Sequence, residues 1–514
     1  MTAKPSLKRS AIFNLLGSVL PTFISLVTTP IYLHHIGAER FGVLAILWML
    51  QGYFGFLDLG LSAAASNRIA QLSDATPAER ESVLWTALLL NLGFGLVGAL
   101  LLFALIHVML AQFDIGPVLA AELRPAQSWI CALVPLTNLI GACNGAMSGR
   151  EQFGVSNAVQ VPVVILFQLI PLCFAIVFGP SLHYLVFATL TASVISLIIT
   201  FAAMAYVFPL RLAARPKRQH VRQLFSYGAW ISISSFATPL LETADRLLIG
   251  RVLGPQAVAY YQVPFSLAVR TRLLPNVITR TLFPRLSSLG SDDAAQLSLL
   301  AVRGLTAALT PTIVCGIFLM RPFLSMWVGH DFANRASSVG ETILLGVWIN
   351  CLASIPACHL QAIGRPGIVA RFQIVETVLF IAGLWWALHA LGVLGAALAW
   401  SARCALDGVL LFWAARFGPQ QLRQLCVPGL MILAAYGGSY VLDPLSLVGL
   451  TVWISLTCAA IAWSISAEPR ASARIVQMLA SFFQRNRERI RRRGKPHAVG
   501  GEISPNGVTR ESSQ

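Results

Sequence analysis

Runs of about 20 apolar residues recur along nearly the whole chain, and they constrain its fold more than any other feature. A run of that length, wound as a helix, crosses a hydrocarbon core about 30 Å thick. Inside lipid every backbone polar group must be satisfied within the protein, so only helices and closed β-barrels can span it. Near-continuous apolar stretches such as 163–178 lack the alternating pattern of barrel strands. The sequence therefore predicts an all-α integral membrane protein.

Composition and charge support the same class and exclude others. The chain is 56% hydrophobic and only 11% charged, whereas soluble domains are about 25% charged. Its net charge of +16 lies in short loops and in the C-terminal tail rather than on one domain face. This pattern is typical of the positive-inside rule, so we predict the lipid bilayer, and no nucleic acid, as a partner. The nine cysteines form no CxxC pair or Cys/His cluster, which predicts no metal site and no cofactor.

The hydropathy pattern predicts about fourteen spans between residues 10 and 466, among them 41–66 and 256–276. Twelve of them fall into two six-helix lobes, so the count is 12 to 14, depending on the last pair. An even number places both termini on one side, and both termini are basic. The connections on that side are also the richer in arginine, which makes it the cytoplasmic side.

A basic segment in the middle of the chain divides the spans into two sets. The predicted units are an N-terminal six-helix lobe (1–207), a basic cytoplasmic linker (208–223), a C-terminal six-helix lobe (224–417), an extra helix pair (418–466) and a tail (467–514) that is basic and amphipathic, then disordered. Ile36-Gly37 ends the first span of one lobe and Leu253-Gly254 that of the other. This echo indicates a repeat, a plan in which transporters bind substrate between the lobes. A glycine turn between any two helices is the alternative.

Charged residues inside the spans are the most informative, because each costs at least about 2.5–3.5 kcal/mol at the bilayer centre. The seventh span holds Glu242, Asp245 and Arg246, and Glu242 and Arg246 are four apart, the spacing of an ion pair on one helical face. Arg403 and Asp407 in the twelfth span are also four apart. Each pair is either a structural clamp or part of the transport mechanism.

Two further acids lack such a local partner. Asp58 in the second span has no basic residue three or four positions away, so it must face another helix or a wet cavity. Glu376 in the eleventh span is a candidate proton carrier or a partner of an arginine elsewhere. Together with the two pairs above, these acids are our candidates for ion coupling.

Arg270 and Arg272 lie at the end of the eighth span, and with Arg280 two to three turns further on they form a positive strip without nearby acids. A guanidinium group matches phosphate oxygens in a bidentate geometry, so the strip suits an anionic ligand. The alternative is that the Arg270 and Arg272 side chains extend to the inner lipid headgroups.

Prolines in corresponding spans of the two lobes are candidate hinges. Pro21 and Pro30 lie in the first span and Pro239 in the seventh, and helices interrupted there can bend as alternating access requires. Proline is also common in membrane helices for packing reasons.

Catalytic motifs are missing. The sequence contains no GxxxxGK[ST] phosphate loop, no HExxH and no GxSxG. We therefore predict no catalytic residues and a transporter rather than an enzyme, driven by an ion gradient, the membrane potential or substrate asymmetry.

Several motifs together resemble one family, the Wzx-like polysaccharide-export flippases of the multidrug, oligosaccharidyl-lipid and polysaccharide exporter superfamily. They are Thr29-Pro30-Ile31-Tyr32-Leu33, Ile36-Gly37, Phe56-Leu57-Asp58-Leu59-Gly60-Leu61 and Arg68 in the first lobe, and Asp245-Arg246-Leu247-Leu248-Ile249-Gly250, Leu253-Gly254 and Tyr260-Tyr261 in the second. Members of this family commonly have twelve helices, so the pair at 418–466 departs from the pattern.

The resemblance implies a function. It implies a bacterial inner-membrane flippase that moves an undecaprenyl-pyrophosphate-linked oligosaccharide from the cytoplasmic to the periplasmic leaflet by rocking of the two lobes. The pyrophosphate would bind Arg246, Arg270, Arg272 or Arg280, and polysaccharide polymerase and chain-length machinery would be partners. The alternatives are a multidrug or organic-cation antiporter on the same scaffold and a membrane polysaccharide polymerase or ligase.

Overall fold

The computed structural model describes residues 7–54, 58, 60–72, 76–112, 116–150, 152–208, 221, 244–443 and 446–467. Glu242, Pro239, most of the predicted linker and the tail beyond Ala467 lie outside these ranges.

The described residues form helices and no strands. The helices are α1 (Leu7–Phe54), α2 (Leu61–Gln71), α3 (Pro77–Gln112), α4 (Pro117–Leu123), η2 (Arg124–Ala126), α5 (Gln127–Gly149), α6 (Phe153–Phe178), α7 (Leu182–Val207), a helix over 244–253, α9 (Pro255–Ala268), η3 (Val269–Arg272), α10 (Leu273–Ser288), α11 (Ser291–Trp327), α12 (His330–Ala362), α13 (Pro366–Ala414), α14 (Pro419–Val441) and α15 (Leu447–Ala467). Nine helices in the described part are long and apolar enough to cross a membrane. The predicted all-α membrane class is confirmed.

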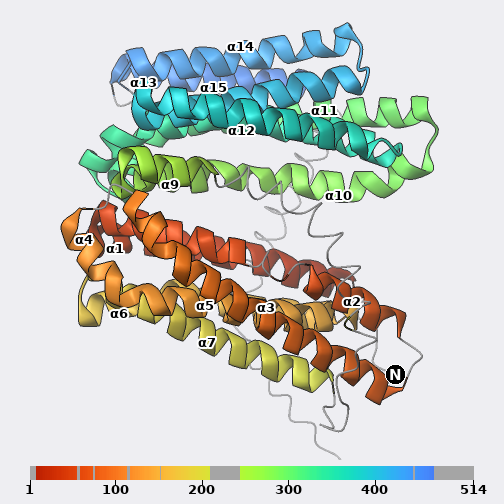
Figure 1. The fold of residues 1–514 in the computed structure, drawn as a ribbon. Coiled ribbons are helices and arrows are strands. Elements are labelled where there is room, and N and C mark those ends of the chain that lie inside the picture. Colours follow the sequence, from red (N-terminus) through yellow and green to blue (C-terminus); the bar gives the residue numbers. More distant parts are fainter. Residues whose placement is uncertain are drawn as a thin grey trace, which may run out of the picture.

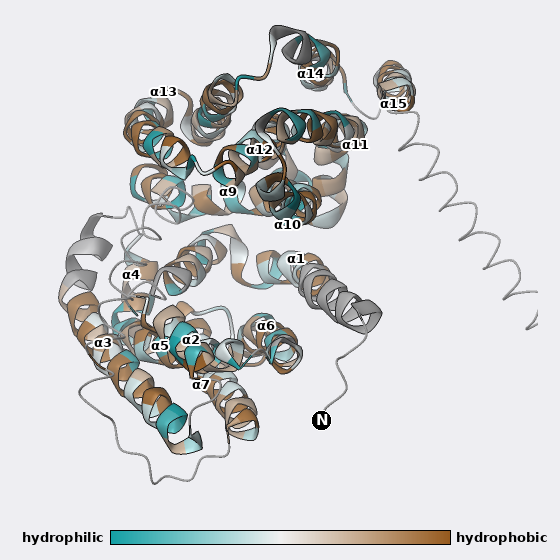
Figure 2. Cartoon of the chain, turned by 90° about the vertical axis from the view of Figure 1, so that its right-hand side faces the viewer, coloured by the Kyte–Doolittle hydropathy of each residue, from teal (hydrophilic) through white to brown (hydrophobic). Residues whose placement is uncertain are grey.

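The helices form two groups that lie one above the other in Figure 1. Helices α1–α7 make up one group and α9–α15 the other, with α1 lying against α9 where the groups meet. Seen nearly end-on in Figure 2, α1 occupies the boundary between the groups. Large apolar side chains such as Leu100 and Val177 remain exposed, as expected of surfaces that face lipid.

The two glycines of the predicted repeat have nearly the same backbone conformation. Gly37 interrupts α1 with φ 76° and ψ 164°, and Gly254 precedes α9 with φ 82° and ψ 171°. Positive φ favours glycine, which explains the residue at both bends. The helix after each bend is itself interrupted and continues as α2 after Gly37 and as α10 after Gly254. Arg68 follows Gly37 by the same number of residues as Arg285 follows Gly254. This correspondence supports our hypothesis that the groups are repeats.

The interruptions differ from the predicted continuous spans. Span 41–66 is broken between the end of α1 and the start of α2, and span 256–276 is divided by the 3₁₀ turn η3. Pro30 lies within helical backbone of α1, and the helix is interrupted at Gly37 instead. Pro21 also falls in α1, with its side chain outside the described part. The proline hinges stay a prediction.

The two C-terminal helices are attached to the second group by directed hydrogen bonds. Ser439 Oγ of α14 donates to Glu341 Oε2 of α12 at 2.9 Å. Ser464 Oγ of α15 donates to the carbonyl oxygen of Ala307 in α11 at 2.7 Å. The helices that depart from the family's usual twelve are therefore packed against the second group by more than apolar contact.

Candidate functional site

A cavity of about 450 Å³ lies where the two helix groups meet. Its lining comes from α1, α6, the helix over 244–253, α9, η3 and α13, and consists of Ser25, Thr29, Phe41, Ala45, Trp48, Met49, Gln168, Arg246, Gln262, Val263, Phe265, Ser266, Val269, Arg272 and Trp400. Two of these lining residues are charged, and both are arginines, Arg246 and Arg272. The cavity therefore combines positive charge, amides, hydroxyls and aromatic rings, which are groups that bind phosphate and sugar.

Arg246 is held in place by a buried polar network. Its Nη1 lies 3.3 Å from Asp245 Oδ1, and its Nε donates to Gln262 Oε1. The guanidinium carbon also lies 4.4 Å from the centroid of the Phe265 ring, within the range of a cation–π interaction. Asp245 is fully buried, and its Oδ2 accepts a hydrogen bond from the Tyr261 hydroxyl at 2.7 Å. This network fixes one cationic group at the cavity wall.

A second arginine reaches the cavity from the 3₁₀ turn η3. A 3₁₀ helix has three residues per turn, so residues three apart lie on the same side. Val269 and Arg272 have this spacing, and both line the cavity. The Arg272 guanidinium carbon lies 5.7 Å from the centroid of a Trp400 ring, which also lines it. Within this turn, Arg272 faces the cavity and Arg270 does not.

The other two arginines of the strip occupy different places. Arg270 is half-buried, and its Nη2 donates to Ser25 Oγ of α1 at 3.0 Å, which links the two helix groups. Arg280 is exposed on α10 and is not among the residues that line the cavity. The structure thus brings Arg246 and Arg272 together at the cavity, places Arg270 at its edge and leaves Arg280 outside.

Polar groups on the α1 side complete the cavity. Tyr32 donates its hydroxyl to the carbonyl oxygen of Gln168 at 2.6 Å, and Thr28 Oγ1 donates to Gln168 Oε1 at 3.1 Å, so α6 is fixed against α1. The indole N–H of Trp48 is buried without a hydrogen-bond partner in the described part of the chain. A buried donor without a partner is costly, which indicates that a ligand or water meets it.

Of the predicted acidic candidates, Asp245 holds Arg246 at the cavity wall, whereas Glu376, Asp407 and Asp58 are not among the residues that line the cavity. Glu376 and Asp407, from the two halves of α13, lie close enough to Arg403 for their charges to interact. Glu376 is 1% exposed, and the Arg403 guanidinium lies 5.4 Å from the Phe380 ring centroid. Arg403 lies in the other half of the same helix, across the bend at Gly392, but both carboxyl oxygens of Glu376 are buried without a hydrogen-bond partner in the described part of the chain.

Asp58 has a local structural partner. Its Oδ1 accepts from the Gly60 amide at 2.6 Å and its Oδ2 from the Ser62 amide at 3.3 Å. These are backbone donors at the start of α2 that otherwise lack a partner inside the membrane. The carboxylate therefore stabilises the interruption of the second span, which hydropathy alone could not reveal.

Several cavity residues were missed from the sequence, namely Ser25, Thr29, Trp48, Gln168, Gln262 and Trp400. One signal could have found some of them. Ser25 and Thr29 are polar residues four apart in an apolar helix, and such a pair shares one helical face. Trp400 and Gln168 carry no comparable signal, because only packing brings their helices to the cavity.

Comparisons with known proteins agree with this architecture. The sequence model of the family described as "Polysaccharide biosynthesis protein" matches residues 7–290, more than half of the chain. A putative O-antigen transporter of Shigella flexneri is 27% identical over 79% of this chain and 97% of its own length. A probable flippase of Haloferax volcanii, AglR, is 21% identical over 84% of this chain and 87% of its own.

A solved structure shows the same fold. The lipid II flippase MurJ, in an inward closed conformation, superposes with a TM-score of 0.69 at 12% identity, covering 90% of this chain and 100% of that one. At this identity the likeness concerns the fold alone. With the family match, it confirms the Wzx-like resemblance, and the chain belongs to the polysaccharide biosynthesis protein family of membrane transporters.

Proposed function

We propose that this protein is a flippase that moves an undecaprenyl-pyrophosphate-linked oligosaccharide from the cytoplasmic to the periplasmic leaflet of the bacterial inner membrane. The observation that carries the proposal is the cavity between the two helix groups, whose charged lining residues are Arg246 and Arg272. Guanidinium groups bind pyrophosphate oxygens, while the amides and the Trp48 indole can bind sugar hydroxyls. An organic cation would instead require acidic residues, and none lines this cavity in the described part of the chain.

The contacts between the groups suggest how the substrate would move. On the side of the Gly37 and Gly254 bends, Gly42 of α1 packs directly on the backbone of Pro255, and Trp327 Nε1 donates to the Leu26 carbonyl oxygen at 2.7 Å. With both termini cytoplasmic, this closed side is the periplasmic one. We propose that these contacts break when the groups rock as two lobes, which exposes the cavity to the other leaflet.

A leaflet assay tests the flippase proposal directly. In a strain that lacks this protein, lipid-linked oligosaccharide should accumulate in the cytoplasmic leaflet, because the charged headgroup cannot cross lipid unaided. The wild-type gene should restore the normal distribution, as measured by labelling of accessible glycan in intact cells and in inverted vesicles. An unchanged distribution in the deletion strain would contradict the proposal, provided that no second transporter of this family is present.

We further propose that the Glu376, Arg403 and Asp407 cluster couples transport to an ion gradient. A carboxyl group can exchange a proton or bind a cation, whereas an amide of the same shape cannot. We expect Glu376→Gln to keep substrate binding but lose the acceleration that an imposed proton or sodium gradient produces in proteoliposomes.

Glu341→Gln is the matched control for this experiment. Glu341 is also a buried carboxyl group of the second helix group, but it bonds to Ser439 of α14. This variant should keep its gradient dependence. If Glu376→Gln responds to gradients as the wild type does, the cluster has a structural role and no part in coupling.

A further inference from the structure

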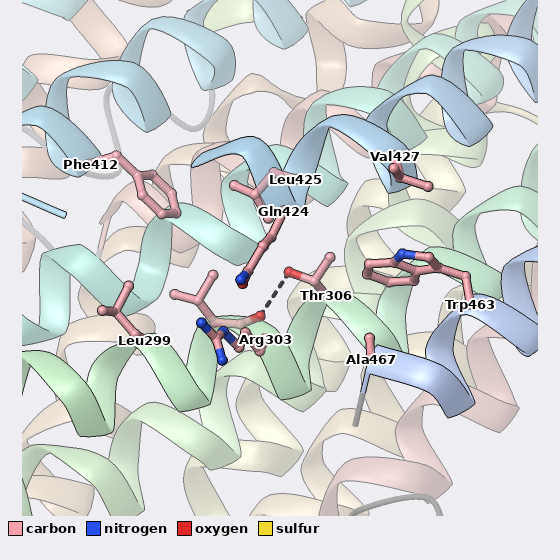
Figure 3. A pocket seen from close by; sticks show the side chains of 10 residues that line it. Leu299, Arg303, Thr306, Phe412, Gln424, Leu425, Val427, Trp463 and Ala467 are labelled. Carbon is pink, nitrogen blue, oxygen red and sulfur yellow. Dashed lines mark hydrogen bonds between the residues drawn. The ribbon is translucent and has the colours of Figure 1, made fainter. Parts of the chain in front are cut away.

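A second hollow, separate from the central cavity, lies on the flank of the second helix group. This groove has a volume of about 360 Å³ and shares no lining residue with the cavity. It lies between α11, α13, α14 and α15 and is lined by Leu299, Val302, Arg303, Thr306, Phe412, Gln424, Leu425, Val427, Trp463 and Ala467 (Figure 3). Most of these side chains are apolar.

Helix ends place the groove at one surface of the membrane. Phe412 lies next to the end of α13, Gln424 near the start of α14, and Trp463 and Ala467 at the end of α15. The exposed Arg416 lies in the connection between α13 and α14, and the exposed Arg423 lies near the start of α14; both belong to the predicted cytoplasmic side. Tryptophan is enriched at the level of lipid headgroups. The groove is therefore open to the headgroups of the cytoplasmic leaflet.

The polar side chains of the groove are suited to a phosphate. In Figure 3 the exposed Arg303 of α11 and Gln424 of α14 approach each other from opposite walls. The Thr306 hydroxyl donates its hydrogen to the carbonyl oxygen of Val302 at 2.7 Å, so this hydrogen is not available to a phosphate. None of the described lining residues is acidic. The groove thus offers one guanidinium and one amide beside an apolar wall.

We propose that this groove binds an anionic phospholipid of the cytoplasmic leaflet. Its phosphate lies at Arg303 and Gln424, and an acyl chain packs against Leu425, Val427 and Trp463. An anionic headgroup is favoured over a zwitterionic one, because an added ammonium group would approach Arg303 and the neighbouring Arg423. In Figure 2, α15 stands apart from α14, and both helices pack mainly on α11. A lipid seated there fills the space between helices that contact each other little.

Lipid titration of the purified, delipidated protein tests the headgroup contact. Binding of dioleoyl-phosphatidylglycerol and dioleoyl-phosphatidylethanolamine is measured by native mass spectrometry. We expect phosphatidylglycerol to bind more tightly, and Arg303→Gln to weaken it by about fivefold, the effect of one arginine near an anionic surface. Arg365→Gln, which removes an exposed arginine outside the groove, should leave binding unchanged. Equal binding of both lipids, or the same affinity for Arg303→Gln as for wild type, would overturn the proposal.

Two further comparisons test the apolar part and the identity of the lipid. Val427 and Val409 are both exposed, but only Val427 lines the groove. Val427→Trp should fill the groove and reduce phosphatidylglycerol binding, whereas Val409→Trp should not. Undecaprenyl phosphate is then added at an equal concentration. If it displaces phosphatidylglycerol in the wild type but not in Val427→Trp, the groove belongs to the transported lipid and the proposal is wrong. Retention of phosphatidylglycerol supports it.

Discussion

Replacing Arg272 with glutamine should slow the movement of lipid-linked oligosaccharide by about one to two orders of magnitude. Arg272 lines the central cavity and lies against Trp400, where it can bind pyrophosphate with two parallel N–H groups. Glutamine removes the charge and the fork, and a hydrogen bond to a charged group contributes about 1.5–3 kcal/mol. The initial rate of glycan appearance in the outer leaflet measures the effect, with the amount of protein in the membrane held equal.

Arg280→Gln is the control for this prediction, since Arg280 comes from the same basic strip but is exposed outside the cavity. It should transport at nearly the wild-type rate. Arg272→Lys should recover part of the activity, because it restores the charge without the bidentate geometry or the ring contact. Equal rates for Arg272→Gln and Arg280→Gln would show that the arginine cavity does not bind the transported headgroup.

Replacing Gly42 with alanine should separate the two helix groups on the side of the Gly37 bend. A Cβ atom at position 42 would lie 1.7 Å from the carbonyl oxygen of Pro255 and 2.6 Å from its carbonyl carbon. These are backbone atoms that cannot rotate away, so α1 and α9 must move apart. Overpacking of this kind costs about 1–3 kcal/mol, enough to shift a conformational equilibrium about 5- to 150-fold.

A cysteine at the cavity wall can report this separation. With the nine native cysteines replaced, Thr29→Cys should react slowly with a membrane-impermeant maleimide applied from the side of the Gly37 bend. Adding Gly42→Ala should speed this reaction and reduce transport. Gly93→Ala in α3 should do neither, because a Cβ there meets nothing within 4 Å. If Gly42→Ala leaves both labelling and transport at wild-type levels, the contact between α1 and α9 is not part of a gate.

The local features of this protein followed from its sequence. Long apolar runs can only be helices inside lipid, so the all-α membrane class needed no knowledge of tertiary contacts. Glycine is the residue that tolerates positive φ, which is why Gly37 and Gly254 marked the bends. Charge inside an apolar span is costly, and this cost placed Arg246, Arg272 and Glu376 among a larger set of candidate residues.

Tertiary structure decided which of these residues meet. The strip of Arg270, Arg272 and Arg280 is uniform in sequence, but of the three only Arg272 lines the cavity, where it lies against Trp400 of α13. The sequence predicted that Asp58 faces another helix or a wet cavity, but its carboxylate accepts hydrogen bonds from the Gly60 and Ser62 amides at the start of α2. Hydropathy and spacing describe one helix at a time, whereas the cavity forms from side chains on helices that are distant in sequence and adjacent only after packing.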